Sequence, residues 1–288
     1  MSTPGGATEA IMAGSLGHRR AWHHPTMATV LPLILLPPSE GKAAAGTGPP
    51  WSPGSMSLTL DPQRAEVAAA LAAAMRGPEA ARSTLLGVKG KALAAASAAN
   101  SAARTAPTLP AIDRYTGVLY DALDRGSLPA AQRERLDRSV LIFSGLWGAV
   151  APADPIPDYK LKMGAALPHL GKLSTWWRGD LSAAVAARAA GRTVWNLLPA
   201  EHAAAWDAPA GLTQIIVRFL EPRPDGSLSG VSHWNKYLKG ALVRYLLANP
   251  GAGPADLRTW KHPSGFRLVP SLTEHGDDVT VLSMVKRA

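Results

Sequence analysis

Short apolar runs separated by turn residues mark the strands that the sequence predicts. Residues 30–36 (VLPLILL) and 139–143 (SVLIF) are continuous apolar runs, as is typical of buried strands. The same criterion predicts further strands at residues 192–198, 212–220, 266–270 and 278–286. The turn sequence Pro224-Asp225-Gly226 favours a hairpin after the fourth of these six strands.

Helices are expected between the strands. Asp61-Pro62 is a helix start, with Asp61 as N-cap and proline at the first helical position, and the alanine-rich run that follows ends at Gly77-Pro78. Further helices are expected over residues 91–104, 110–125, 174–190 and about 234–248. Residues 43–58 are rich in Ala, Gly, Pro and Ser and are expected to form a mobile loop.

The irregular alternation of strands and helices favours the α/β class in its mixed α+β form. We expect a single compact domain with a central mixed sheet surrounded by helices. Residues 1–28 lack hydrophobic periodicity, and Met27 stands just before the first strand. Residues 1–28 are therefore expected to be a disordered tail or a mis-assigned start, and residues 29–288 the domain.

Composition narrows the classes of function. The chain of 288 residues has 30 Lys and Arg against 21 Asp and Glu, a net charge of +9, which favours an anionic partner. The absence of cysteine excludes disulfides, thiol catalysis and cysteine metal sites. No histidine pair has metal-site spacing, so neither a metal nor a cofactor is expected. No apolar run approaches the ~18 residues of a membrane span, so no membrane partner is expected, and the oligomeric state stays open.

A polar motif follows the first strand directly. In Pro37-Pro38-Ser39-Glu40-Gly41-Lys42, the hydroxyl of Ser39, the amides near Gly41 and the ammonium of Lys42 can hold an anionic oxygen. Ligands usually lie at the carboxyl end of such a strand. The GxxxxGK[ST] spacing of a nucleotide triphosphate loop is absent, and a solvated turn explains the segment equally well.

A glycine-lysine turn lies between two helical stretches. Residues 85–92 (LLGVKGKA) resemble the turn of a helix-hairpin-helix element, in which two glycines let backbone amides approach a phosphate. Lys89, Lys91 and Arg82 would add attraction to neighbouring phosphates. A glycine-rich connection with solvated lysines is the alternative.

Two later segments also carry candidate binding residues. The irregular stretch 144–164 offers Asp154, Asp158, Tyr159 and Lys160 as the rim of a pocket. The alternative is a rigid connection, bracketed by prolines, whose aspartates cap turns.

The helix at residues 233–244 places His233, Lys236 and Lys239 within a ~120° arc, which suits phosphate or carboxylate binding. A solvated polar face explains this pattern nearly as well. Glu201 and His202 follow the strand that contains Asn196, and they are a candidate acid–base pair or simply surface groups.

Taken together, these segments resemble the YaaA family of cytosolic peroxide-stress proteins, from about Leu31 to Val285. The residues that carry the resemblance are Ser39-Glu40-Gly41-Lys42, Tyr115-Thr116-Gly117, Ser144-Gly145-Leu146-Trp147-Gly148 with Pro152 and Asp154, Pro157-x-Tyr159-Lys160-Leu161-x-Met163-Gly164, Trp177-x-Gly179-Asp180, Asn196-Leu197 with Glu201, and Lys236-x-x-Lys239-Gly240-x-x-x-Arg244. The resemblance implies a compact α/β fold with a positively charged cleft. It also implies binding of double-stranded or structured DNA with a helix-hairpin-helix element, in a cytoplasmic protein that limits peroxide damage by keeping unincorporated iron low. Lys160 departs from the family, which commonly has Arg at this position.

Two hypotheses of different classes follow. In the first, the protein binds DNA, mainly through its phosphates, with Lys89, Lys91 and the basic helix in contact. In the second, it is an enzyme on a small anionic substrate bearing a nucleotide, phosphate or sulfate group. The residues expected to converge on that substrate are Ser39, Lys42, Tyr159, Asn196, Lys236, Lys239 and Arg244. DNA binding ranks first by resemblance, and whether a reaction is catalysed stays open.

Overall fold

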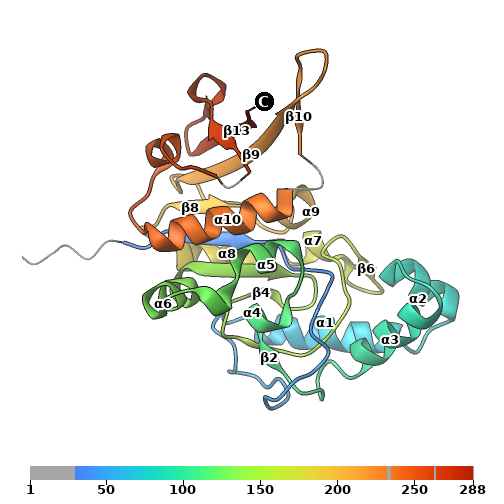
Figure 1. Ribbon diagram of the computed structural model, residues 1–288. Helices are drawn as coiled ribbons and strands as arrows, with labels where there is room; N and C mark the ends of the chain where they lie inside the picture. The colour runs from blue at the N-terminus through green and yellow to red at the C-terminus, as the bar shows by residue number, and fades with distance from the viewer. Residues whose placement is uncertain (1–29, 232–234, 263, 288) are drawn as a thin grey trace, which may run out of the picture.

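The computed structural model describes residues 30–231, 235–262 and 264–287. Its main sheet has nine strands, in the order β11-β13-β9-β8-β1-β3-β4, with β10 paired to β9 and β12 to β13 (Figure 1). The strands of this sheet are β1 (Leu33–Leu36), β3 (Val140–Ser144), β4 (Gly148–Val150), β8 (Val194–Asn196), β9 (Gln214–Pro222), β10 (Leu228–Gly230), β11 (Phe266–Leu268), β12 (Glu274–His275) and β13 (Val279–Lys286). Two small pairs lie outside it: β2 (Leu109–Pro110) with β5 (Pro155–Ile156), and β6 (Ala166–Leu167) with β7 (Gly171–Lys172).

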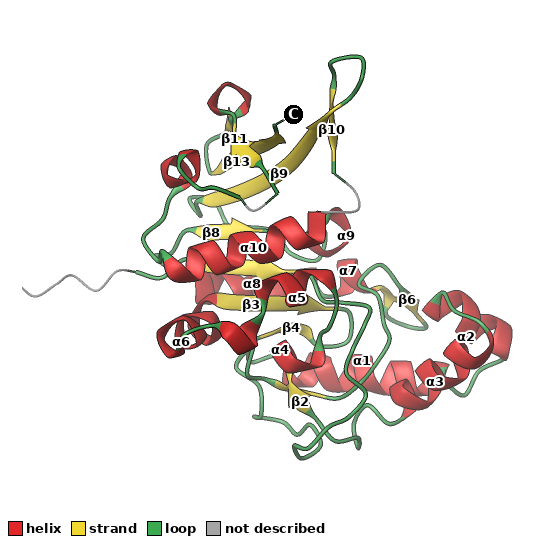
Figure 2. Cartoon of the chain, viewed as in Figure 1, coloured by secondary structure: helices red, strands yellow, loops and turns green. Residues whose placement is uncertain are grey.

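Ten α-helices and three short 3-10 helices accompany the sheet in the described part of the chain. The α-helices are α1 (Asp61–Ala74), α2 (Glu79–Leu86), α3 (Gly90–Ser101), α4 (Ala111–Arg114), α5 (Val118–Leu123), α6 (Ala130–Ser139), α7 (Leu173–Trp176), α8 (Arg178–Ala189), α9 (Ala200–Ala203) and α10 (Asn235–Ala248). The 3-10 helices are η1 (Arg125–Ser127), η2 (Pro254–Arg258) and η3 (Pro270–Leu272). Helices α5 and α10 lie on one face of the sheet and α8 on the other (Figure 2). None of these helices is long and apolar enough to cross a bilayer.

Five neighbouring strands of the sheet are parallel. Strand β1 pairs in parallel with both β3 and β8, and the parallel series continues through β9 to β13. The chain therefore runs from β1 to β3 on one side and then crosses to β8 on the other side. Such a reversal of strand order opens a crevice at the carboxyl ends of the strands, where α/β proteins bind ligands.

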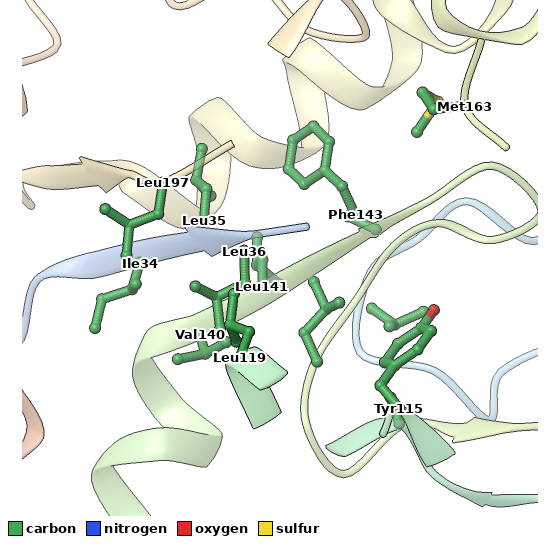
Figure 3. Packing of buried hydrophobic residues seen from close by; sticks show 14 of the residues in the cluster. Ile34, Leu35, Leu36, Tyr115, Leu119, Val140, Leu141, Phe143, Met163 and Leu197 are labelled. Carbon is green, nitrogen blue, oxygen red and sulfur yellow. The ribbon is translucent and has the colours of Figure 1, made fainter. Parts of the chain in front are cut away.

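The hydrophobic core lies around the two strands that the sequence predicts most directly. Ile34, Leu35 and Leu36 of β1 and Leu141 and Phe143 of β3 are at most 1% exposed. Figure 3 shows these side chains together with Leu119 of α5. Because both faces of these strands are covered, their residues form continuous apolar runs and do not alternate with polar ones.

The predicted strands, the hairpin after β9 and the mixed α/β class are confirmed. Among the helices, residues 110–125 form two short ones, α4 and α5, because Gly117 has a φ of +100° and Thr116 donates its amide to the carbonyl of Gly41. The N-cap assignment of Asp61 is wrong. This residue is already the first helical residue, and its carboxylate binds the amide of Gly54 and the guanidinium of Arg64. The predictions for residues 1–28 and for the side chain of His233 lie outside the described residues.

The segment 43–58 has no helix or named strand, as predicted, but it packs against the rest of the molecule. The ring of Trp51 is buried beside that of Trp147, with ring centroids 5.5 Å apart. Arg114, fully buried, donates to the carbonyl of Ala45 at 2.8 Å. These contacts fix a stretch whose composition alone suggested mobility.

Asp154 has a structural position and does not line the pocket rim. Its carboxylate is 3% exposed and accepts hydrogen bonds from the amide and hydroxyl of Ser57 and from the amide of Ala151. The alternative interpretation, in which an aspartate caps a turn of a rigid connection, is therefore correct for this residue.

Candidate functional site

A cavity of about 690 Å³ lies at the carboxyl ends of β1 and β8. Its walls come from five segments that are distant in sequence, namely residues 37–42, 117–120, 159–162, 199–202 and 235–239. We call it the Lys42 cavity. It lies where the strand order reverses, which is the position that the topology of the sheet favours for a ligand.

Cations outnumber anions in the lining of the Lys42 cavity. The charged residues that line it are Lys42, Lys160, Lys162, Lys236 and Lys239, with Glu40 and Glu201. Five ammonium groups against two carboxylates leave an excess of three positive charges before any ligand is bound. Of the predicted site residues, Ser39, Lys42, Tyr159, Lys160, Lys236 and Lys239 are thus brought together.

Lys42 is the most constrained of these lysines. Its Nζ donates to the carbonyl of Ser39 at 3.0 Å and lies 4.4 Å from the ring centroid of Tyr159 and 5.5 Å from that of Tyr115. Burial lowers the pKa of Lys42 to about 8, with a further lowering by Lys160 and an opposing effect of Asp158. Near neutral pH its ammonium is therefore held close to its point of deprotonation.

Tyr159 connects the cavity to the core through its hydroxyl. This hydroxyl lies 2.7 Å from the hydroxyl of Tyr115 and 2.7 Å from Oγ of Ser144, which in turn accepts the amide of Trp147. Burial raises the pKa of Tyr159 to about 12. The hydroxyl is therefore a fixed structural group, and the face of its ring is what lies beneath the ammonium of Lys42.

The opposite wall of the cavity follows β8 and includes the start of α10. Lys239 donates to the carbonyl of Leu197 at 2.8 Å, and burial lowers its pKa to about 8. Burial also lowers the pKa of His202, which Glu201 opposes and Lys239 reinforces. Glu201 accepts the amide of Gly164 at 2.7 Å, so its carboxylate joins two walls of the cavity.

At the open rim, Glu40 lies between two lysines. Its carboxylate is 3.6 Å from Nζ of Lys160 and 3.4 Å from Nζ of Lys162. Burial alone would raise the pKa of Glu40, but the two ammonium groups bring it below its ordinary value. These exposed pairs are weak and readily exchange partners.

Two predicted residues point away from this cavity. The amide of Asn196 donates to Gln214, and its oxygen accepts the amide of Leu198, so Asn196 closes the turn after β8. Arg244 donates to the carbonyls of Leu123 and Asp124 and thereby satisfies the end of α5. Neither residue lines the Lys42 cavity.

Lys89 and Lys91 lie at the connection between α2 and α3, exposed and outside the cavity lining. Helix α3 is nevertheless joined to the cavity rim near its other end. Asn100 donates to the carbonyl of Lys160 at 2.9 Å and accepts the amide of Lys160 at 2.8 Å. This reciprocal pair fixes the orientation of α3 relative to the rim.

Some residues of the site were missed by sequence reasoning. Tyr120 lines the cavity and donates its hydroxyl to the carbonyl of Pro37, and Lys162 pairs with Glu40 at the rim. Lys162 stands two positions after Lys160, and this spacing could have predicted a second lysine at the rim. The sequence gives no such indication for Tyr120, because its position depends on the break between α4 and α5. Among residues 30–231, 235–262 and 264–287, no cluster of three or more His, Asp and Glu side chains can hold a metal ion.

Comparison with known proteins places this arrangement in a family. A family model described as peroxide stress protein YaaA matches residues 33–272, which is most of the chain. The chain belongs to the YaaA family. All five wall segments of the Lys42 cavity and both helices α2 and α3 fall within the matched residues of this YaaA-family protein.

Curated relatives also align with most of this chain. The chain is 43% identical to the UPF0246 protein SCO2297 of Streptomyces coelicolor over 228 residues, which cover 78% of this chain and 87% of that relative. It is 37% identical to the UPF0246 protein Cgl1995/cg2186 of Corynebacterium glutamicum over 219 residues, 74% of this chain and 84% of the relative. These alignments support the same family membership across most of both chains.

Proposed function

We propose that this YaaA-family protein acts in the response to peroxide by binding DNA in the cytoplasm, mainly through phosphate contacts. The family description provides the link to peroxide stress, and the net charge of +9 favours a polyanion. The proposed contact surface runs from the connection between α2 and α3 to the rim of the Lys42 cavity. Contacts of this kind carry little sequence preference.

The α2–α3 connection supplies the first part of this surface. Only three residues separate the two helices, and Gly87 and Gly90 both have positive φ, at +66° and +55°. A Cβ at either glycine would meet no atom within 4 Å, so the backbone there is open to a ligand. With Lys89 and Lys91 exposed beside it, the turn suits the phosphate contact of a helix-hairpin-helix element.

The reciprocal hydrogen bonds between Asn100 and Lys160 are the observation that carries the proposal. They tie one end of α3 to the rim lysines, while the other end of α3 begins at the lysine-bearing turn. At a rise of ~1.5 Å per residue, the nine steps from Lys91 to Asn100 span about 14 Å. For a helix α3 aligned with the duplex axis, this length corresponds to about four nucleotides, because consecutive phosphates of one strand are about 3.4 Å apart along that axis.

The test is the affinity for a duplex oligonucleotide, measured by fluorescence anisotropy across a salt series. Replacement of Lys89 and Lys91 by Glu is expected to remove most of the binding and to reduce the slope of log affinity against log salt by about two, one for each lost phosphate contact. The matched control is the double change Arg223→Glu and Arg258→Glu. It alters two exposed residues far along the chain and changes the net charge equally.

The expected outcome separates position from total charge. A selective loss in the Lys89/Lys91 variant supports the proposal, because both variants have the same net charge. Equal losses in the two variants, or an affinity that does not respond to salt, would show that the α2–α3 turn is no phosphate site.

The alternative, an enzyme on a small anionic substrate, stays a prediction. Ser39, Lys42, Tyr159, Lys236 and Lys239 share one cavity, as that hypothesis requires. Its other two members, Asn196 and Arg244, are engaged with neighbouring protein groups, so the predicted set is incomplete.

A further inference from the structure

Two lysines of the cavity each bind a main-chain carbonyl just beyond the end of one of two neighbouring strands. The ammonium of Lys42 binds the carbonyl of Ser39, three residues beyond β1, and that of Lys239 binds the carbonyl of Leu197, one residue beyond β8. Strands β1 and β8 are adjacent and parallel, with Leu35 opposite Asn196. The two ammonium groups therefore flank the crevice between the carboxyl ends of these strands.

Neither ammonium is neutralised by a carboxylate in the described part of the chain. No ion pair joins Lys42 or Lys239 to Asp or Glu there, and each donates one hydrogen bond, to a main-chain oxygen. An ammonium has three donors, so each lysine keeps donors for a ligand. Burying two ammonium groups without a carboxylate partner costs stability, which is the usual mark of a binding site and not of a packing role.

We infer that Lys42 and Lys239 form a subsite for a dianionic phosphomonoester group. Two ammonium groups match the two charges of a terminal phosphate, whereas a phosphodiester carries one charge and two bulky substituents. The hydroxyl of Ser39 lies beside Gly117, where a Cβ would come within 3.2 Å of Ser39 Oγ, and it offers a further donor at the same wall. This subsite goes beyond the proposed DNA contact and does not depend on it.

The remaining space suits the rest of such a ligand. A cavity of about 690 Å³ is within the size range of small-molecule sites and has room for a nucleoside beyond its phosphate. Two sources share this chemistry: a free nucleoside monophosphate, and the 5′-phosphate at the end of a DNA strand. The cavity lies at the rim that α3 orients, so either source can reach it.

Other charged groups that face these lysines also affect their pKa values. Asp158 and Glu40 raise the pKa of Lys42, while Lys160 and Arg114 lower it. On the other wall, Lys239 faces His202, which Glu201 adjoins. The lysines are present in both titration states near pH 8, so a bound dianion draws protons onto them.

Because of this proton linkage, the affinity of the subsite should depend on pH. A phosphomonoester loses its second charge below a pKa of about 6, and the lysines lose theirs above about 8. Affinity is therefore expected to peak between these limits and to fall above pH 8 by about tenfold per unit for each lysine involved. A phosphodiester has no group that titrates near pH 6, so its affinity should not fall as the pH is lowered through 6.

The experiment is isothermal titration calorimetry of the full chain with adenosine 5′-monophosphate, in two buffers of different ionisation enthalpy at pH 7, 8 and 9. Adenosine and 3′,5′-cyclic adenosine monophosphate are the matched ligands without a dianionic phosphate. We expect net proton uptake at pH 8 and 9, and binding of the monophosphate at least tenfold tighter than that of either control. Binding without proton uptake, or equal affinity for the cyclic diester, would overturn the subsite.

Variants locate the protons taken up. Lys42→Met and Lys239→Met should each lower the affinity at least tenfold and reduce the proton uptake, while Lys172→Met, exposed and outside the cavity, should change neither. Thermal unfolding confirms that each variant folds. If a variant does not fold, the proton uptake measured with the wild-type protein still tests the subsite. Competition by a 5′-phosphorylated oligonucleotide but not by its 5′-hydroxyl counterpart would assign the source to a DNA end. Competition by neither would assign it to a free nucleotide.

This design keeps the two proposals apart. Closed circular duplex DNA has no end to present, so its binding reports only the contacts along the backbone. Loss of monophosphate binding in the Lys42 and Lys239 variants with circular DNA binding retained supports the subsite on its own. Retained monophosphate binding in both variants contradicts the subsite whatever happens to the DNA.

Discussion

The hydroxyl of Tyr159 shows how one polar atom holds the site in place. It bridges Tyr115 and Ser144 at 2.7 Å on each side, while its ring supports the ammonium of Lys42. Tyr159→Phe keeps the ring and leaves two buried hydroxyls with one partner fewer. We expect a loss of about 1–3 kcal/mol in the free energy of unfolding, measured by urea denaturation.

Tyr120→Phe is the matched control, because Tyr120 is also buried and makes one hydrogen bond, to the carbonyl of Pro37. It should lose only about 1 kcal/mol. An equal or larger loss in Tyr120→Phe would show that the two hydrogen bonds of Tyr159 contribute no more to stability than the single one of Tyr120.

Single residues also mark the limit of what the sequence predicts. Lys42 was recognised because it follows a strand, and Lys239 because it shares a helix face with Lys236. Arg244 occurs in the same helical motif as Lys239 but turns to the end of α5, because the carbonyls of Leu123 and Asp124 there accept its donors. That competition depends on a neighbouring helix and leaves no trace in the local sequence.

At the level of secondary structure, the close approach of α10 to α5 positions the lysines of α10. A Cβ at Gly240 would lie 2.3 Å from the carbonyl oxygen of Leu119 and 2.8 Å from Cβ of Ala122. Gly240→Ala should therefore destabilise the protein by more than the ~1 kcal/mol that alanine gains in a helix, and it should weaken monophosphate binding because α10 carries Lys239.

Gly179→Ala in α8 is the matched control, because a Cβ there meets no atom within 4 Å. It should leave stability unchanged or raise it. Both variants are compared by thermal unfolding, and a stabilised Gly240→Ala protein would show that α10 can shift without cost.

The elements themselves were largely predictable where composition and periodicity agree. Strands β1 and β3 are continuous apolar runs, and α3 and α10 are long enough to show a helical pattern. The division between α4 and α5 was not predictable, because it depends on Gly117 and on the bond from Thr116 to Gly41 across the chain. Helix α6 was missed as well, since it is polar over most of its length and buries only Leu136 and Ser139.

For the whole molecule, the order of the strands is what makes one site out of scattered motifs. The sequence predicts that Ser39 and Lys42 follow one strand and that Glu201 follows another, but not that these two strands are neighbours. Pairing of β1 with β8 brings both ends together, and long-range pairing of this kind has no local signal. The convergence of the predicted residues is thus a property of the topology.

The buried ammonium groups of the cavity should also be visible in the stability of the whole molecule. Lys42 and Lys239 titrate at about 8 in the folded protein and at about 10.4 when unfolded. Between these values the unfolded chain binds up to two more protons, so the free energy of unfolding should rise with pH, by about 2–3 kcal/mol per unit for the two lysines together. Above about pH 10 it should fall, because buried Tyr115, Tyr120 and Tyr159 keep protons that the unfolded chain loses.

Urea unfolding between pH 7 and 11 measures this profile, and the double variant Lys42→Met and Lys239→Met is its control. The variant removes the two groups that cause the rise, so it should be more stable than the wild type at pH 7. Its free energy of unfolding should not change with pH between pH 8 and 10, and above pH 10 it should fall as steeply as that of the wild type. A bound phosphomonoester should stabilise the wild type at pH 7 and not the variant, because it compensates the same charges. A wild-type profile that already falls from pH 8 would mean that neither lysine bears an uncompensated charge in the folded protein, and the reason for placing an anion between them would be lost.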